Sequence, residues 1–101
     1  YVYGGTSLTN GADCSGFVMS VFANFGYSLP RVAAAQCEAS TKKDISQLEP
    51  GDLVFYGSGY IDHVALYIGD GKIIHASNAA TGIKISDYDY EKPAAVGTFM
   101  E

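Results

Sequence analysis

Cys14 is the residue in this sequence best placed to act as a nucleophile. It follows Asp13 at the start of a stretch whose apolar residues, Phe17 to Phe25, recur at steps of three and four. This spacing predicts an amphipathic helix over residues 14–25 with Asp13 as its N-cap. A thiol in the first turn of a helix is favoured as thiolate by unpaired N–H groups and the helix dipole. Cys14 also falls on the apolar stripe, so a role as a core residue stays open.

The two histidines of the chain lie in one predicted hairpin, whose arms flank Gly69-Asp70-Gly71. A two-residue loop would turn His63 and His75 to opposite faces, because side chains alternate along a strand. A three-residue loop or a bulge would place them on one face as diagonal neighbours, roughly 7–8 Å apart. In that register His63 can take a proton from Cys14 while His75 orients its ring, as in acyl-transfer enzymes. A working pair therefore predicts an odd-length loop or a bulge.

The same side chains allow two other uses. Cys14, Cys37 and the two histidines could supply four zinc ligands, but the close ligand pairs of zinc sites are missing, and we expect no metal. Cys14 and Cys37 could instead form a disulfide in a non-catalytic module. By itself, Cys37 is expected to be a structural residue.

Helical patterns come first along the chain and strand patterns follow. A loop-rich opening and the first helix precede an alanine-rich second helix within residues 31–40. Strands are expected over residues 53–56, in both arms of the hairpin, over 82–86 and near 94–100. This order indicates an α+β domain with an antiparallel sheet rather than alternating βαβ units.

Size and charge narrow the class of protein further. The 101 residues indicate one domain over residues 1–101, and the absence of a starting methionine suggests that it comes from a longer protein. A net charge of -5 disfavours nucleic acid and anionic membrane surfaces as partners. Since no apolar run approaches the roughly 20 residues that cross a bilayer, we expect no membrane span.

Several motifs in one order carry a specific resemblance. The stretches YVYGG, DCSGFV, LPR, PGDLVFY and HVALYIGDGKIIHAS together resemble the NlpC-type cell-wall peptidases, including their p-sixty relatives, over nearly the whole chain. The resemblance implies a papain-like fold, in which a helix bearing the cysteine packs on a central antiparallel sheet of about five or six strands. It further implies a secreted or wall-associated bacterial cysteine endopeptidase that needs no cofactor. Its substrates would be peptidoglycan stem peptides, cleaved between D-γ-glutamate and meso-diaminopimelate or lysine. As an isolated domain we expect a monomer.

The resemblance also assigns roles to single residues. Cys14 matches the nucleophile, His63 the general base and His75 the third polar residue. Tyr1 matches a tyrosine whose hydroxyl lies near the nucleophile and helps to bind the oxyanion.

Asp13 and Ser15 match residues that hold the free amino end of the substrate, although Asp13 could serve as a helix cap alone. The stretch after LPR lacks the serine or threonine often found there in the family. Two alternatives remain: an amidase or acyl transferase acting on another γ-glutamyl substrate, and a non-catalytic module that binds cell wall and contains a Cys14–Cys37 disulfide.

Overall fold

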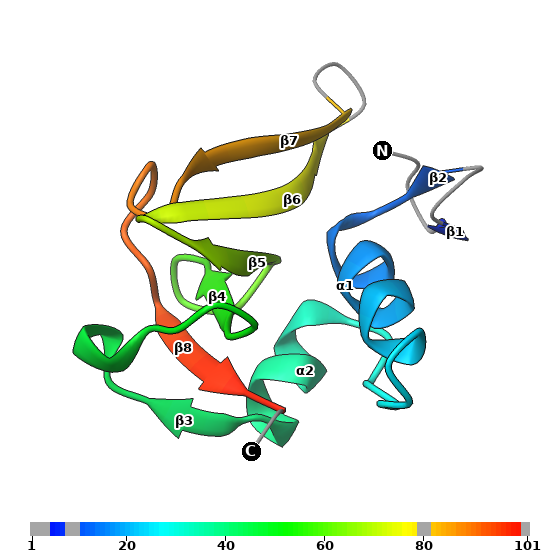
Figure 1. Ribbon diagram of the computed structural model, residues 1–101, viewed down its shortest axis with the longest axis horizontal. Helices are drawn as coiled ribbons and strands as arrows, with labels where there is room; N and C mark the ends of the chain where they lie inside the picture. The colour runs from blue at the N-terminus through cyan, green and yellow to red at the C-terminus, as the bar shows by residue number, and fades with distance from the viewer. Residues whose placement is uncertain (1–4, 8–10, 79–81, 100–101) are drawn as a thin grey trace.

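An antiparallel sheet with helices on one face organises the chain (Figure 1). The computed structural model describes residues 5–7, 11–78 and 82–99. Within these ranges the sheet has six strands in the order β3-β8-β4-β5-β6-β7. They are β3 (Thr41–Lys43), β4 (Leu53–Tyr56), β5 (His63–Gly69), β6 (Lys72–Asn78), β7 (Gly82–Asp87) and β8 (Ala95–Thr98). The other elements are α1 (Cys14–Ala23), α2 (Ala33–Ala39), the 3-10 helix η1 (Ile45–Gln47), and a ribbon of β1 (Thr6–Ser7) and β2 (Gly11–Ala12). The predicted α+β architecture is confirmed.

Helix α1 begins at Cys14, as the sequence predicted. The Asp13 carboxylate caps it by accepting the backbone N–H of Gly16 at 2.7 Å. The helix ends at Ala23, two residues earlier than expected, because Gly26 adopts a left-handed φ of 86° that reverses the chain. The prediction that Phe25 continues the buried stripe is therefore wrong: its side chain is 73% exposed.

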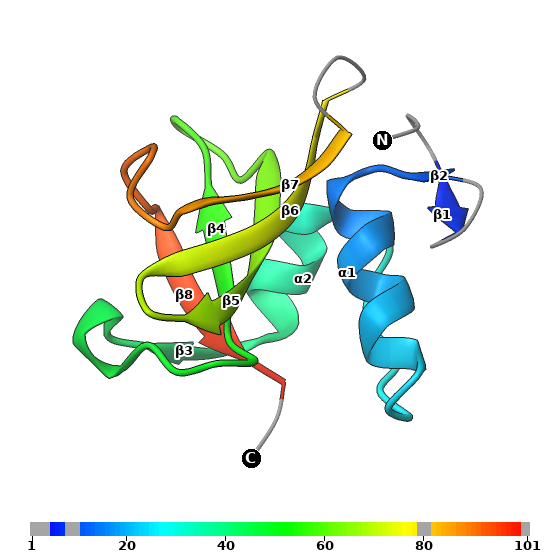
Figure 2. The same ribbon diagram turned by 45° about the horizontal axis from the view of Figure 1, so that its top comes forward.

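The sheet separates two apolar clusters. On the helix side, Phe17, Val18 and Phe22 of α1 pack with inward residues of the strands, including Leu53 and Val64. Full burial of each large side chain is worth about 1.5–3 kcal/mol, so this face fixes α1 against the sheet. Figure 2 shows α1 and α2 together on this side.

The second cluster lies on the other face and contains Val54, Tyr56, Ala65 and Ile73. Strand alternation turns the odd-numbered residues of β5, among them His63, toward this face.

A bulge sets the register of the β5–β6 hairpin. Gly69 pairs with Lys72 across a two-residue turn, but Tyr67 pairs with Ile73, so Ile68 is the extra residue on β5. Asp70 and Gly71 both have positive φ, 55° and 74°, as a type I′ turn requires. The bulge restores the register that brings the two histidines to one face. Of the two alternatives expected, an odd-length loop or a bulge, the bulge is confirmed.

The sequence pattern did not predict three short elements. The loop-rich opening contains the β1–β2 ribbon, with Thr6 opposite Ala12. Strand β3 lies at the edge of the sheet beside β8, and η1 follows it. Elements of two or three residues are too short to show a hydrophobic period. No helix among the described residues is long and apolar enough to span a membrane.

Candidate active site

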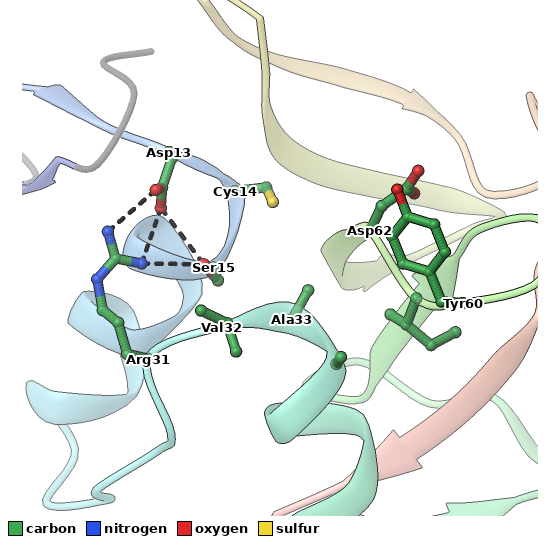
Figure 3. A pocket seen from close by; sticks show the side chains of 10 residues that line it. Asp13, Cys14, Ser15, Arg31, Val32, Ala33, Tyr60 and Asp62 are labelled. Carbon is green, nitrogen blue, oxygen red and sulfur yellow. Dashed lines mark hydrogen bonds and ion pairs between the residues drawn. The ribbon is translucent and has the colours of Figure 1, made fainter.

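Cys14 lies between the two walls of a cleft of about 620 Å³ (Figure 3). On one wall lie the polar side chains that flank the start of α1 and precede α2, namely Asp13, Ser15 and Arg31. On the other wall lies the β4–β5 loop, with Tyr60 and Asp62. The sulfur points into the space between the two walls, where a bound peptide could reach it.

The sulfur of Cys14 contacts the backbone of β5. Burial is the largest influence on this thiol and raises its pKa, and the nearby Asp13 carboxylate raises it further. Backbone N–H groups of Val64, Ser15 and Cys14 itself act in the opposite direction. The N–H groups at the helix start favour thiolate, as expected, but burial outweighs them and the net pKa of Cys14 lies above the ordinary value. Cys14 therefore rests as a thiol, and the Val64 contact places it beside the residue that follows His63.

His63 and His75 face each other directly. Nε2 of His63 lies 2.7 Å from Nδ1 of His75, and the rings meet edge to face with centroids 5.0 Å apart. Nε2 of His75 in turn lies 3.0 Å from Oγ of Ser86 on β7. These contacts join three side chains from β5, β6 and β7 into one row of hydrogen bonds.

Both imidazoles are neutral at pH 7. Burial lowers the pKa of His63, against a raising influence of the nearby Asp62 carboxylate. Burial, followed by the charges of His63 and Lys84, lowers the pKa of His75 to about 4. A neutral His63 can accept a proton, and a neutral His75 can accept a hydrogen bond from it.

Aromatic rings enclose the histidine pair. Tyr56 lies opposite His63 across the β4–β5 ladder, with ring centroids 5.9 Å apart. Tyr90 packs against both Tyr56 and His75, at 5.3 Å in each case. Tyr56 is fixed in turn by its hydroxyl, which donates to the carbonyl of Tyr88 at 2.5 Å. The rings hold the imidazoles in one orientation and desolvate them.

Arg31 is a site residue that the sequence reasoning missed. Its guanidinium donates to both carboxylate oxygens of Asp13, at 3.1 and 3.0 Å, and to Oγ of Ser15 at 3.0 Å. The two residues expected to hold a substrate amine are thus already engaged. The signal in the sequence was the LPR stretch, which is part of the family resemblance and contains Arg31.

A buried amide anchors the same wall. Gln36 of α2 is fully buried and donates through Nε2 to the carbonyls of Ser15, at 3.1 Å, and Pro30, at 2.8 Å. It ties the first turn of α1 to the segment that carries Arg31.

Asp13, Cys14 and Ser15 line the cleft. The Val64 backbone contact places the Cys14 thiol beside the residue that follows His63, and His63 in turn contacts His75. Tyr1 lies outside the described residues, and its role stays a prediction. Cys37 is buried in the core, as expected, and both cysteines are free thiols rather than a disulfide. Across residues 5–7, 11–78 and 82–99, no three His, Cys, Asp or Glu side chains gather as metal ligands would.

Comparison with known proteins shows the family to which the chain is similar. Residues 1–98 match the model of the NlpC/P60 family. The chain is 46% identical to a probable endopeptidase p60 of Listeria innocua, over 99% of this chain and 20% of the relative. It is 40% identical to the gamma-D-glutamyl-L-lysine dipeptidyl-peptidase of Bacillus subtilis, over 91% of this chain and 33% of that enzyme.

A solved structure agrees with the fold. The crystal structure of an NlpC/P60 family protein from Bacillus cereus superposes with a TM-score of 0.94 at 32% identity, covering 100% of this chain and 35% of that one. The chain thus spans between a fifth and about a third of the length of these relatives. With the helix-on-sheet core, the cysteine at the start of α1 and the match over residues 1–98, the chain belongs to the NlpC/P60 family.

Proposed function

We propose that the chain is a cysteine endopeptidase domain that hydrolyses peptidoglycan stem peptides. Cys14 is the nucleophile, His63 the general base and acid, and His75 the residue that orients His63. The observation that carries the proposal is the 2.7 Å contact between the two histidines, together with a cysteine that opens into a cleft and contacts the backbone of Val64, the residue after His63. The names of the relatives, endopeptidase and dipeptidyl-peptidase, favour the same reaction.

In the first half of the reaction, the sulfur of Cys14 attacks the scissile carbonyl. The S–C bond forms as the thiol proton passes to His63, which matters because the free thiol is not ionised at rest. His63 then gives this proton to the leaving amine as the C–N bond breaks. The products are the free amine and a thioester on Cys14.

In the second half, water resolves the thioester. His63 takes a proton from the water as its oxygen attacks the thioester carbonyl, and the S–C bond breaks. The sulfur leaves as thiolate and recovers the proton from His63, so the carboxylic acid departs and the site returns to its starting state. The neutral ring of His75 holds His63 in place for both transfers.

We infer that the bond cleaved joins D-γ-glutamate to a diamino acid. The relative named for a γ-D-glutamyl-L-lysine substrate supports this bond. So does the charge of the cleft: the carboxylate of Asp13 is paired with Arg31, whereas Asp62 forms no ion pair within the described residues. An uncompensated carboxylate on one wall favours a substrate that carries an ammonium group there.

We propose that the chain is the catalytic domain of a longer bacterial protein that acts at the cell wall, either secreted or wall-associated. The relatives, which it covers only in part, include a bifunctional muramidase/DL-endopeptidase and a peptidoglycan endopeptidase. A single domain of this kind is expected to act as a monomer, with further domains delivering it to its substrate.

Digestion of defined muropeptides tests the proposal. Lysine-type and diaminopimelate-type stems are incubated with the protein, and the product masses are read by mass spectrometry. We expect a fragment ending in D-glutamate and a fragment beginning with the diamino acid. Cys14→Ala should abolish this cleavage, whereas Cys37→Ala, which removes a buried thiol, should retain it. Cleavage by Cys14→Ala, or products cut at another bond, would contradict the proposal.

A further inference from the structure

The hydroxyl of Ser86 ends the row of polar groups that begins at His63. The ring of His75 stands between them, with Nδ1 2.7 Å from His63 Nε2 and Nε2 3.0 Å from Ser86 Oγ. His75 has no exposed surface, so each ring nitrogen depends on its protein partner for hydrogen bonding. In a neutral imidazole one nitrogen donates and the other accepts, and the partners decide which.

We propose that Ser86 is a positioning residue that holds His75 in the tautomer protonated at Nε2. In that tautomer His75 Nδ1 accepts the N–H of His63 Nε2. The other nitrogen of His63, Nδ1, then carries the lone pair that takes the thiol proton. This role rests on the proposed function, because it matters only if His63 is the base toward Cys14.

Only two proton arrangements satisfy the whole row. In one, His63 donates to His75 and His75 donates to Ser86, which leaves a basic nitrogen on His63 for the thiol. In the other, Ser86 donates to His75 and His75 donates to His63, which puts the proton of His63 on Nδ1, where the base is needed. The second arrangement has no acceptor for the thiol, so the direction of the row decides whether the site can react.

Ser86 permits the productive direction because its hydroxyl can accept the N–H of His75 Nε2, and loss of the hydroxyl disfavours that direction. Without the hydroxyl, a proton on His75 Nε2 would be a buried donor with no acceptor, which is among the rarest and costliest defects in proteins. A bare lone pair at the same atom costs less. Loss of the Ser86 hydroxyl therefore shifts His75 toward the tautomer protonated at Nδ1. The hydrogen bond between the histidines then reverses, with His75 donating to His63.

The fold places Ser86 for this task. Strand β7 pairs with β6 so that Lys84 lies opposite His75 and Ser86 lies opposite Ile73. Ser86 is thus the diagonal neighbour of His75 on the same sheet face. The groups facing His75 are His63 on β5, Lys84 and Ser86 on β7, and Tyr90 beyond β7. The positive charge of Lys84 opposes an imidazolium, so His75 changes tautomer without changing charge.

Nitrogen-15 NMR of the histidine rings tests the proposal without a substrate. In the wild-type domain near pH 7, we expect His75 to carry its proton on Nε2; a proton on Nδ1 would overturn the proposal at once. In Ser86→Ala the Nδ1–H form should become populated, while Ser86→Thr, which keeps the hydroxyl, should resemble wild type. Ile85→Ala serves as the control for strand β7, because Ile85 is 60% exposed and alternation turns it to the other face.

Kinetics on muropeptides give the second readout. In Ser86→Ala, kcat should fall about 10-fold, the value of one neutral hydrogen bond, with KM unchanged. Ser86→Thr should restore kcat, and Ile85→Ala should not alter it. A Ser86→Ala protein with wild-type tautomer and kcat would overturn the proposal. If instead no variant or wild type cleaved muropeptides while the tautomers shifted as expected, the proposed function would fail and the tautomer assignment would stand.

Discussion

Asp13 and Arg31 form a two-point ion pair directly before Cys14. Their closest contact, Arg31 Nη2 to Asp13 Oδ2, is 3.0 Å, and the Asp13 side chain is only 15% exposed. The same carboxylate caps α1 through the N–H of Gly16. Asp13 therefore does two structural jobs beside Cys14, and Arg31 limits the cost of a negative charge next to a thiol that must lose its proton.

Substitutions in this ion pair should move the Cys14 pKa in opposite directions. Asp13→Asn keeps a capping side chain but removes the negative charge that raises the pKa, so the thiol pKa should fall. Arg31→Gln leaves the carboxylate uncompensated, so the thiol pKa should rise. Alkylation rates of Cys14 with iodoacetamide across pH report both. Shifts in the same direction would show that the pair does not act on the thiol.

The same variants should differ modestly in stability. Since Arg31 is partly exposed, its loss should lower the free energy of unfolding by about 1 kcal/mol, as for other solvent-screened pairs. Asp13→Ala, which also removes the cap, should cost about 1 kcal/mol more than Asp13→Asn. Urea unfolding of the three variants measures these differences, and equal values for Asp13→Ala and Asp13→Asn would contradict the capping role.

Activity should follow the neutral form of the Cys14–His63 pair. Because burial lowers the pKa of His63, the acid limb of kcat/KM should lie below pH 6.5, the ordinary value for histidine. The thiol pKa is raised, so the alkaline limb should lie above the ordinary cysteine value. Asp62→Asn removes a charge that raises the His63 pKa and should move the acid limb to lower pH. No shift in this variant would exclude Asp62 as an electrostatic neighbour of the base.

Stability should depend on pH through His75. Its folded pKa of about 4 lies below the unfolded value near 6.5. The unfolded chain therefore binds this proton first as the pH falls. The neutral state of buried His75 therefore adds about 3 kcal/mol to the free energy of unfolding above about pH 6.5. This stabilisation is lost as the pH falls from about 6.5 to about 4.

A comparison with His75→Gln isolates this contribution from the carboxylates, which titrate in both proteins. Urea unfolding of wild type should weaken more steeply than that of the variant between pH 6.5 and pH 4. Parallel stability curves would mean that the buried histidine does not stay neutral in the folded state.

Gly16 should tolerate no side chain. A Cβ there would lie 2.1 Å from the carbonyl oxygen of Gly5 and 2.8 Å from the Asp13 carboxylate. That carbonyl also accepts the N–H of Asp13 at 3.0 Å, so Gly16→Ala must displace the segment that enters α1. We expect a loss of about 1–3 kcal/mol in unfolding free energy together with a drop in activity.

Gly26→Ala, at the other end of the same helix, provides the contrast. It meets no atoms within 4 Å but is strained by its φ of 86°, so it should lose about 1 kcal/mol with activity intact. If Gly16→Ala were as active as Gly26→Ala, the close approach at the helix start would not matter for the site.

Local patterns were enough to place the reactive groups. The cap and the apolar spacing located Cys14 at a helix start. The demand that two histidines cooperate predicted an odd-length loop or a bulge, and the structure has a bulge, at Ile68. Both inferences concern residues close in sequence, where backbone geometry limits the outcomes. The helix end was misplaced because a left-handed Gly26 overrides an apolar pattern that would otherwise include Phe25.

Contacts between segments far apart in the sequence could not be predicted from local patterns. Ser86 was assigned to a strand, but its contact with His75 depends on which strand pairs with β6 and in which register. The Asp13–Arg31 pair depends on how the segment before α2 returns to α1. The net shift of the Cys14 pKa also could not be predicted from the sequence, because burial raises this pKa more than the N–H groups at the helix start lower it.

The central claim is that Cys14 carries the acyl group of the cleaved peptide. Rapid acid quenching during turnover of a lysine-type muropeptide, followed by peptide mapping, tests it most directly. The account predicts that the peptide containing Cys14 gains the mass of the glutamyl fragment while the lysine-bearing fragment is already free. Turnover with no modification of Cys14, or with the acyl group on Cys37, would contradict it.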